Sequence, residues 1–241
     1  MSLLSESLFD FLELDDVSFS IEKGEFVAIV GSSGSGKSTL LHIIGGLDNP
    51  TSGQVIVDGQ NLSHMTDEEL TIFRRRNIGF VFQQYNLVPM LNVWENIVLP
   101  VKLDGKKIEK GYVNEIIDTL GIRTKLENLP SALSGGQQQR VAIARALAAK
   151  PAILLADEPV ASLDPVTGRQ ILELLRSIHE TEGVTILMNS HNLEFSREFS
   201  QRLIGLRDGK IVFDGKTAEL TEEITEQIYT NSENTVRKNE V

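Results

Sequence analysis

The sequence predicts an α/β protein whose parallel core sheet is interrupted by an inserted α-helical subdomain and accompanied by an N-terminal antiparallel β part. Three observations predict this class. A short apolar run at residues 25–30 leads through a glycine-rich loop into a helix beginning near Leu40. Residues from about 90 to 150 read mainly as helix, with apolar positions at helical spacing. After residue 150, strands and helices alternate again, which is typical of a parallel sheet.

Composition narrows the class of protein. The chain of 241 residues is long enough to bury a sizeable core, and it contains no Cys, which excludes a disulfide framework and suits a reducing cytosol. Its net charge of −11, from 23 basic and 34 acidic residues, argues against a nucleic-acid partner. Its apolar runs are too short to cross a bilayer, and we see no signal peptide. We therefore expect a soluble cytoplasmic protein without direct membrane insertion.

The first part of the chain predicts mostly strands. Thr66 and Glu69 have the spacing of a capping box, which predicts a helix start. The basic cluster Arg74-Arg75-Arg76 is interpreted as a solvated helix end rather than a binding patch. Strands are expected at residues 12–21, 25–30, 54–57 and 78–82.

The rest of the chain follows the same two periodicities. Helices are predicted at 92–99, 112–120, 138–150 and 166–182, strands at 152–156 and 184–188, and a hairpin of 202–206 with 210–213 around Asp208-Gly209. These elements place the core at residues 1–84 and 151–229 of a single domain and the helical subdomain at about 85–150. A polar tail at 230–241 is expected to be disordered.

The glycine-rich loop matches the phosphate-binding pattern G-x-x-x-x-G-K-[ST], and it has the strand–loop–helix context that this P-loop motif requires. Its glycines let successive backbone N–H groups turn toward an anion, and the following helix adds its positive end. Lys37 can reach the β- and γ-phosphates of a nucleoside triphosphate, and the Ser38 hydroxyl can hold Mg²⁺. The expected nucleotide-binding residues are Gly31, Ser32, Ser33, Gly34, Ser35, Gly36, Lys37, Ser38 and Thr39.

An apolar strand that ends in Asp157 and Glu158 supplies the acidic element that such a loop needs. Because successive strand residues point to opposite sides, the two carboxylates can have different roles. Asp157 is expected in the Mg²⁺ shell, and Glu158 is expected to polarise the water that attacks the γ-phosphate. Without the P-loop upstream, a plain strand end would be an equally good interpretation.

A second helix start, at Ser134, Gly135, Gly136 and Gln137, predicts another anion site. One chain is poorly suited to wrap both sites around one phosphate chain, so a head-to-tail pair of chains is the economical hypothesis. Taken alone, the segment would be a serine-capped helix after a flexible turn.

The order of these motifs, with Gln83, Ser162-Leu163-Asp164 and His191, resembles the ATP-binding-cassette (ABC) ATPases, the nucleotide-binding subunits of ABC transporters. The resemblance extends from about Leu12 to Gly215. It implies a P-loop NTPase (RecA-like) core, ATP and Mg²⁺ as ligands, and two cassettes that sandwich two ATP molecules. It also implies a membrane permease as partner, with the cassettes held at the inner face of the membrane.

The resemblance also implies roles for single residues. Gln83 would join the Mg²⁺ and water site to the helical subdomain, as metal contact and catalytic sensor. Asp164 would contact the partner cassette, and His191 would contact the γ-phosphate, although a histidine after a strand is more often structural. Phe9 or Phe11 would stack on adenine, and Asn189-Ser190 depart from the small residues that usually precede the histidine.

The subfamily signal is divided. Residues 79–89, 92–100 and 133–140 resemble cassettes of macrolide efflux, lipoprotein release and antimicrobial-peptide resistance, whereas 159–165, 202–215 and 218–221 are similar to phosphonate-import cassettes. Coupling to a permease runs beside Gln83 and the helical insertion, so efflux or extraction is our first interpretation and phosphonate import the second.

Two other classes of function stay as alternatives. A P-loop kinase would transfer phosphate to a small molecule, but it would need neither residues 133–137 nor Asp164. A non-transport ABC ATPase of the cell-division or regulatory type fits the motifs as well. Ribosome-acting and DNA-repair types fit less well, because this chain has one cassette, no Cys and no long heptad run.

Overall fold

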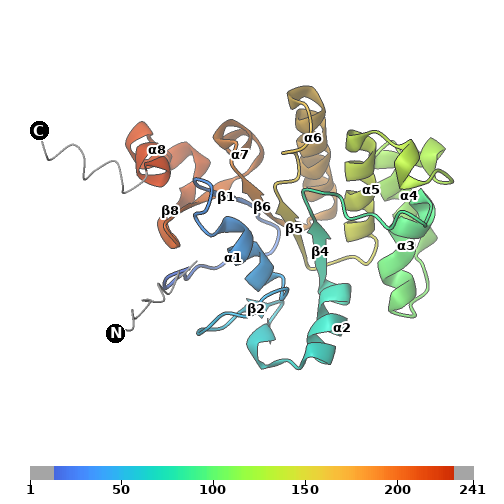
Figure 1. Cartoon of the computed structure of the whole chain (residues 1–241), viewed down its shortest axis with the longest axis horizontal. Helices are drawn as coiled ribbons and strands as arrows, with labels where there is room; N and C mark the ends of the chain where they lie inside the picture. Colours follow the sequence, from blue (N-terminus) through green and yellow to red (C-terminus); the bar gives the residue numbers. More distant parts are fainter. Residues whose placement is uncertain (1–13, 231–241) are drawn as a thin grey trace, which may run out of the picture.

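A six-stranded sheet with the order β4-β5-β6-β1-β7-β8 forms the centre of the computed structural model, which describes residues 14–230 (Figure 1). The first five of these strands are parallel, and β8 pairs antiparallel with β7. A separate antiparallel pair is formed by β2 and β3. The strands are β1 (Phe26–Val30), β2 (Ile56–Val57), β3 (Gln60–Asn61), β4 (Ile78–Val81), β5 (Ile153–Asp157), β6 (Thr185–Ser190), β7 (Arg202–Arg207) and β8 (Lys210–Lys216).

Helices cover both faces of the sheet, with α1, α2 and the small β2–β3 sheet on one side and α6, α7 and α8 on the other (Figure 1). The insertion α3–α5 lies beyond β4, where α5 packs against β4 and against α3. The helices are α1 (Lys37–Ile44), α2 (Asp67–Asn77), α3 (Val93–Leu103), α4 (Lys110–Thr119), α5 (Gly135–Leu147), α6 (Pro165–Glu182), α7 (Leu193–Phe199) and α8 (Glu222–Tyr229).

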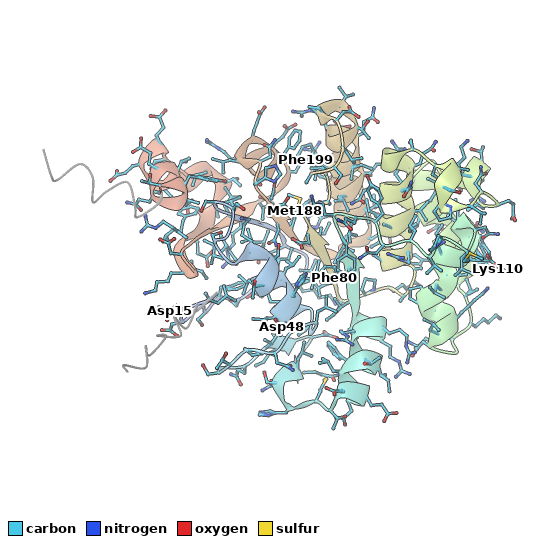
Figure 2. All side chains as sticks on the ribbon, viewed as in Figure 1. Asp15, Asp48, Phe80, Lys110, Met188 and Phe199 are labelled. Carbon is cyan, nitrogen blue, oxygen red and sulfur yellow. The ribbon has the colours of Figure 1, made fainter. Side chains whose placement is uncertain are left out.

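Strand β1 is apolar along its whole length because both of its faces are covered. Along β1, Phe26, Ala28 and Val30 belong to the apolar cluster of one face, whereas Val27 and Ile29 belong to that of the other. Figure 2 shows Met188, from the first cluster, and Phe80, packed against the second, in the middle of the molecule. Because both faces of β1 are packed, the position of this strand is fixed, and so is the start of the loop that follows it.

Most predicted elements are confirmed. Thr66 and Glu69 form the expected capping box, and Asp208 and Gly209 have φ values of 48° and 74°, as the predicted hairpin turn requires. The helix after the glycine-rich loop begins earlier than expected, at Lys37. The helix expected from residue 138 begins at Gly135, while α7, α8 and β3 were not predicted.

The strand expected at residues 12–21 is wrong for its described part, residues 14–21. Val17, Phe19 and Ile21 do alternate inward and pack against the apolar cluster shared with α1 and α2. Their backbone, however, forms no ladder with a neighbouring strand, and the Ser20 carbonyl accepts from the side chain of Arg202 instead. The antiparallel part in the first third of the described chain is therefore limited to β2 and β3.

The arginines lie at the end of α2, as predicted, but their side chains pair with other groups of the chain and are not only solvated. Arg74 donates to the Gly46 carbonyl oxygen at 2.5 Å. The Arg76 and Arg75 side chains lie 2.8 Å and 3.3 Å from the carboxylate of Asp104, which Lys106 also approaches at 3.0 Å. The Asp104 side chain is only 3 % exposed, so this carboxylate joins α2 to the end of α3.

Replacing Asp104 with Asn is expected to lower the melting midpoint at pH 7, because the cations around it lose their carboxylate. Hydrogen bonding from Arg76, together with Lys106, holds the pKa of Asp104 below its ordinary value of 3.8. The stabilisation is therefore fully present above that value and is lost as the pH falls through the lowered pKa of the folded state. Thermal melts across this range should show the difference between wild type and variant narrowing in acid. Glu115→Gln, at an exposed position of α4, is the control. This role would be contradicted if the difference in melting midpoint stayed constant with pH, or if Glu115→Gln showed the same difference.

Among residues 14–230, no helix combines the length and the apolar composition that a membrane span requires.

Candidate functional site

The carboxyl ends of β1, β4, β5 and β6 meet at one edge of the sheet. Strand register places Val30 beside Ser190 and Asp157 beside Asn189. Gly31, Glu158 and His191 directly follow β1, β5 and β6, and Gln83 lies two residues after the end of β4. A parallel sheet therefore collects four of the predicted motifs at the edge where ligands of open α/β sheets bind.

The glycine-rich loop curls tightly between β1 and α1. A side chain at Gly31 would overlap the Leu206 carbonyl oxygen, so the backbone approaches β7 as only glycine allows. Gly34 and Gly36 have φ values of 78° and 95°, and Gly36 leads into α1 without a side-chain cap. The first amides of α1 are therefore not capped by a side chain and suit an anion.

Lys37 folds back over this loop. Its Nζ donates to the carbonyl oxygens of Gly31 at 3.0 Å and Ser32 at 2.7 Å, and the residue is only 6 % exposed. Burial lowers the pKa of Lys37, while the carboxylates of Glu158 and Asp157 act in the opposite direction. The ammonium group is thus held at the mouth of the loop, where a phosphate chain would attract it.

Two oxygen-bearing side chains that could be metal ligands, Ser38 and Asp157, meet beside the loop. The Ser38 Oγ donates to Asp157 Oδ1 at 3.0 Å, and the Asn189 amide donates to the same oxygen at 2.9 Å. His42 Nε2 lies 3.7 Å from Asp157 Oδ2. A hydroxyl and a carboxylate fit Mg²⁺, which takes few protein ligands and completes its shell with phosphate and water. Residues 14–230 hold no cluster of three or more His, Cys, Asp or Glu side chains suited to a metal.

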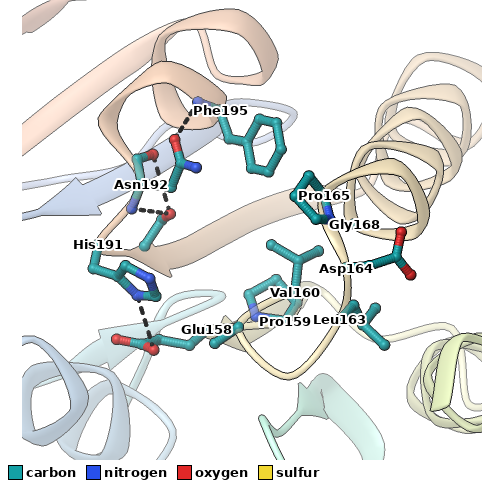
Figure 3. Close-up of a pocket in the computed structure, with 12 residues that line it drawn as sticks. Glu158, Pro159, Val160, Leu163, Asp164, Pro165, Gly168, His191, Asn192 and Phe195 are labelled. Carbon is teal, nitrogen blue, oxygen red and sulfur yellow. Dashed lines mark hydrogen bonds and ion pairs between the residues drawn. The ribbon is translucent and has the colours of Figure 1, made fainter.

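Glu158 points away from Asp157, toward His191. Its φ is 46°, a left-handed conformation that is unusual for a residue other than glycine. A Glu158 carboxylate oxygen lies 3.1 Å from His191 Nδ1 (Figure 3). The Glu158 N–H donates to the Asn189 carbonyl oxygen. The two adjacent carboxylates are therefore separated, one beside Ser38 and the other beside His191.

A cavity of about 150 Å³ opens next to this pair (Figure 3). Glu158 and His191 form its polar end, and Val160, Leu163 and Phe195 form its apolar wall. Ligand pockets are typically about 300–1,000 Å³, so this cavity is too small for a nucleotide. It has room for several water molecules, at about 30 Å³ each, beside the Glu158 carboxylate.

The second predicted anion site lies at the start of α5. Ser134 caps this helix and Gln137 completes the capping box. A side chain at Gly135 would meet the Tyr85 hydroxyl, and one at Gly136 would meet Thr167. Since α5 packs against β4 and α1 against β5 and β6, the start of α5 is separate from the glycine-rich loop that begins α1.

Gln83 is exposed just after β4, and the loop behind it is fastened to the helical insertion. Arg145 of α5 donates to the carbonyl oxygens of Tyr85 and Asn86. Asn96 of α3 is fully buried, accepts from the Val88 N–H and donates to carbonyl oxygens of the same loop. Sequence reasoning missed both residues; a polar side chain in the apolar stripe of α3 was the available signal for Asn96.

Asp164 is exposed. It is also the N-cap of α6, and this capping role was not predicted. Its carboxylate accepts the N–H groups of Val166 at 3.1 Å and Thr167 at 3.0 Å. Hydrogen bonds from the side chain and backbone of Thr167 hold the pKa of Asp164 below its usual range. Phe9 and Phe11, the residues expected to stack on adenine, lie outside the described residues.

The family model and the relatives that match this chain all belong to one protein family. The model of the ABC transporter family matches residues 14–161. An uncharacterized ABC transporter ATP-binding protein of Thermotoga maritima is 50 % identical over 82 % of this chain and 85 % of its own length. The phosphonates import ATP-binding protein PhnC of Staphylococcus saprophyticus is 43 % identical over 91 % of this chain and 89 % of its own.

A solved structure agrees with the described fold. The ATP-binding cassette MJ0796 of Methanocaldococcus jannaschii, a dimer in a post-hydrolysis state bound to ADP and Pi, superposes with a TM-score of 0.77. It is 44 % identical, and the match covers 85 % of this chain and 90 % of that one. With its glycine-rich loop, paired carboxylates and serine-capped α5, this chain is therefore an ATP-binding cassette ATPase of the ABC transporter family.

Proposed function

We propose that the chain binds ATP with Mg²⁺ at residues 31–39 and hydrolyses it to drive efflux or extraction through a membrane permease. The observation that carries the hydrolytic part is the meeting of Lys37, Ser38, Asp157, Glu158 and His191 at one edge of the sheet. In this proposal the chain is held at the inner face of the cell membrane by its contact with that permease.

In this proposal Lys37 would leave the loop carbonyls for the β- and γ-phosphates, and Ser38 and Asp157 would hold Mg²⁺. Bound Mg²⁺ would neutralise phosphate charge that these residues alone cannot offset. Glu158 accepts a proton from water as the water oxygen attacks the γ-phosphorus and the bond to the ADP oxygen breaks. His191 keeps the Glu158 carboxylate oriented and contacts the γ-phosphate. Gln83 links the nucleotide site to the helical insertion.

A second copy of the chain would complete each site. Ser134, Gly135, Gly136 and Gln137 offer a capped helix start that the same chain's loop does not use, and they would face the partner's γ-phosphate. Asp164, exposed at the start of α6, would contact the partner. The dimer observed for the M. jannaschii cassette supports this arrangement. Because both chains would contact the γ-phosphate, ADP would not sustain closure.

The surface around the Gln83 loop is our candidate for the permease contact. Met90 in this loop is 84 % exposed and Leu129 is 46 % exposed. Arg145 and Asn96 fasten the loop, so a partner there would meet a preformed surface. The segments that resemble efflux and extraction cassettes lie here, which is why we favour that direction.

Met90→Asp is expected to reduce capture of the permease by about tenfold or more, since it places a charge on an exposed apolar contact. The protein carries Glu158→Gln to hold ATP, is incubated with Mg-ATP and detergent-solubilised membranes, and retained membrane proteins are identified. Ile56→Asp makes the same change on β2, where Ile56 is 58 % exposed, and should retain the permease. Equal capture by both variants would contradict the assigned surface.

Phosphonate import is the second candidate, favoured by the likeness to PhnC over 91 % of the chain. The same capture experiment separates the candidates. A permease with few spans and a large extracytoplasmic domain would support efflux or extraction, and a compact importer permease would support phosphonate import. Recovery of no membrane protein would favour a non-transport ATPase.

A further inference from the structure

Asn189 is a buried polar residue near the carboxyl end of a central strand. It belongs to β6, whose six residues are all buried, and its own side chain is 0 % exposed. The preceding residues Ile186, Leu187 and Met188 are apolar and belong to the core clusters. An apolar side chain would suit this environment at least as well, so the amide calls for an explanation other than packing.

The amide is satisfied on one side only. Its Nδ2 donates to Asp157 Oδ1 at 2.9 Å, whereas its Oδ1 is buried and has no hydrogen-bond partner within residues 14–230. Native proteins keep few buried polar atoms of this kind, because each carries a desolvation cost. The unpaired oxygen lies on the residue that neighbours Asp157 in the strand register.

The contacts of Asp157 show what the amide does there. Oδ1 accepts from both Ser38 Oγ and Asn189 Nδ2, while Oδ2 faces His42 Nε2. The planar amide therefore sets the rotation of the carboxylate and turns one oxygen toward Ser38. The backbone of the same residue accepts the Glu158 N–H, so Asn189 bonds both members of the acidic pair.

We propose that Asn189 is a positioning residue for Mg²⁺: its amide orients the Asp157 carboxylate beside Ser38. This inference rests on the proposed Mg²⁺ role of Ser38 and Asp157. Removing a partner that orients a metal ligand typically lowers metal affinity by about 10- to 100-fold.

The test measures how strongly Mg²⁺ assists nucleotide binding. The dissociation constant of a non-hydrolysable ATP analogue is determined in excess Mg²⁺ and in EDTA, and the ratio of the two is compared. Asn189→Leu removes the amide at nearly constant volume, and Asn189→Ala is the smaller alternative should leucine disturb folding. Asn49→Leu makes the same change at an exposed position after α1. Melting of the ligand-free proteins in EDTA controls for stability.

We expect the Mg²⁺ assistance to fall by about tenfold or more in both Asn189 variants, with affinity in EDTA within about twofold of wild type. Asn49→Leu should keep the wild-type ratio. If the affinity of the Asn189 variants falls equally with and without Mg²⁺, the residue has a structural role only and the inference is overturned. If Mg²⁺ does not assist binding even in wild type, the proposed metal role of Ser38 and Asp157 fails, and the inference fails with it.

Discussion

Glu158→Gln is expected to slow ATP hydrolysis by about 100- to 10,000-fold while leaving ATP binding intact, the range typical of removing a general base. Glutamine has the same shape and can still contact His191 at the 3.1 Å separation seen for Glu158, so the site keeps its geometry. It cannot accept a proton from the attacking water. The ATP-bound dimer should therefore accumulate instead of turning over.

Phosphate release and size-exclusion chromatography in Mg-ATP measure the two halves of this result. Glu173→Gln, which removes an exposed carboxylate on α6, should leave both unchanged. Near-normal turnover of Glu158→Gln would show that another group accepts the proton.

Lys37→Ala is expected to weaken ATP binding by about 30- to 1,000-fold, the equivalent of about 2–4 kcal/mol for removing one partner of a buried charge pair. The ammonium group is the cation that the structure holds at the loop mouth, next to two carboxylates that repel phosphate. Without it, the net field at the loop would turn against the nucleotide in a protein of net charge −11.

Equilibrium titration with a labelled ATP analogue measures the loss. Lys110→Ala, an exposed lysine at the start of α4, is the matched control and should bind as wild type. Because Lys37 also bonds the loop carbonyls, circular dichroism should confirm that the variant is folded. Undiminished affinity in a folded Lys37→Ala protein would refute the phosphate role.

The order of elements could be predicted because local signals and burial agree along most of the chain. Each central strand is a short apolar run bounded by turn residues, and the capping box at Thr66 and the turn at Asp208-Gly209 are local chemistry. The segment at residues 14–21 was mistaken for a strand because inward alternation reports burial and not pairing. Helix α7 has only 7 residues, too few to show a period.

The candidate site could be predicted where a motif is contiguous, as in the loop around Lys37 or the pair Asp157-Glu158. Contacts between distant segments could not. Asp104 and Arg76 are 28 residues apart, and Arg145 and Tyr85 are 60 apart, so no local pattern announces either contact. The capping role of Asp164 was hidden by its expected role at the partner surface, although aspartate before proline at a helix start is a recognised signal.

The backbone at Glu158 has a consequence for anyone who engineers this protein. A left-handed conformation costs a residue with a Cβ about 1–2 kcal/mol, whereas glycine adopts it freely. With φ at 46°, position 158 is thus a place where a library sorted for heat resistance alone would enrich glycine. Such a library would improve the fold and discard the carboxylate in one step. Directed evolution of this cassette therefore has to screen for turnover as well as for folding, because at this position the two criteria favour different residues.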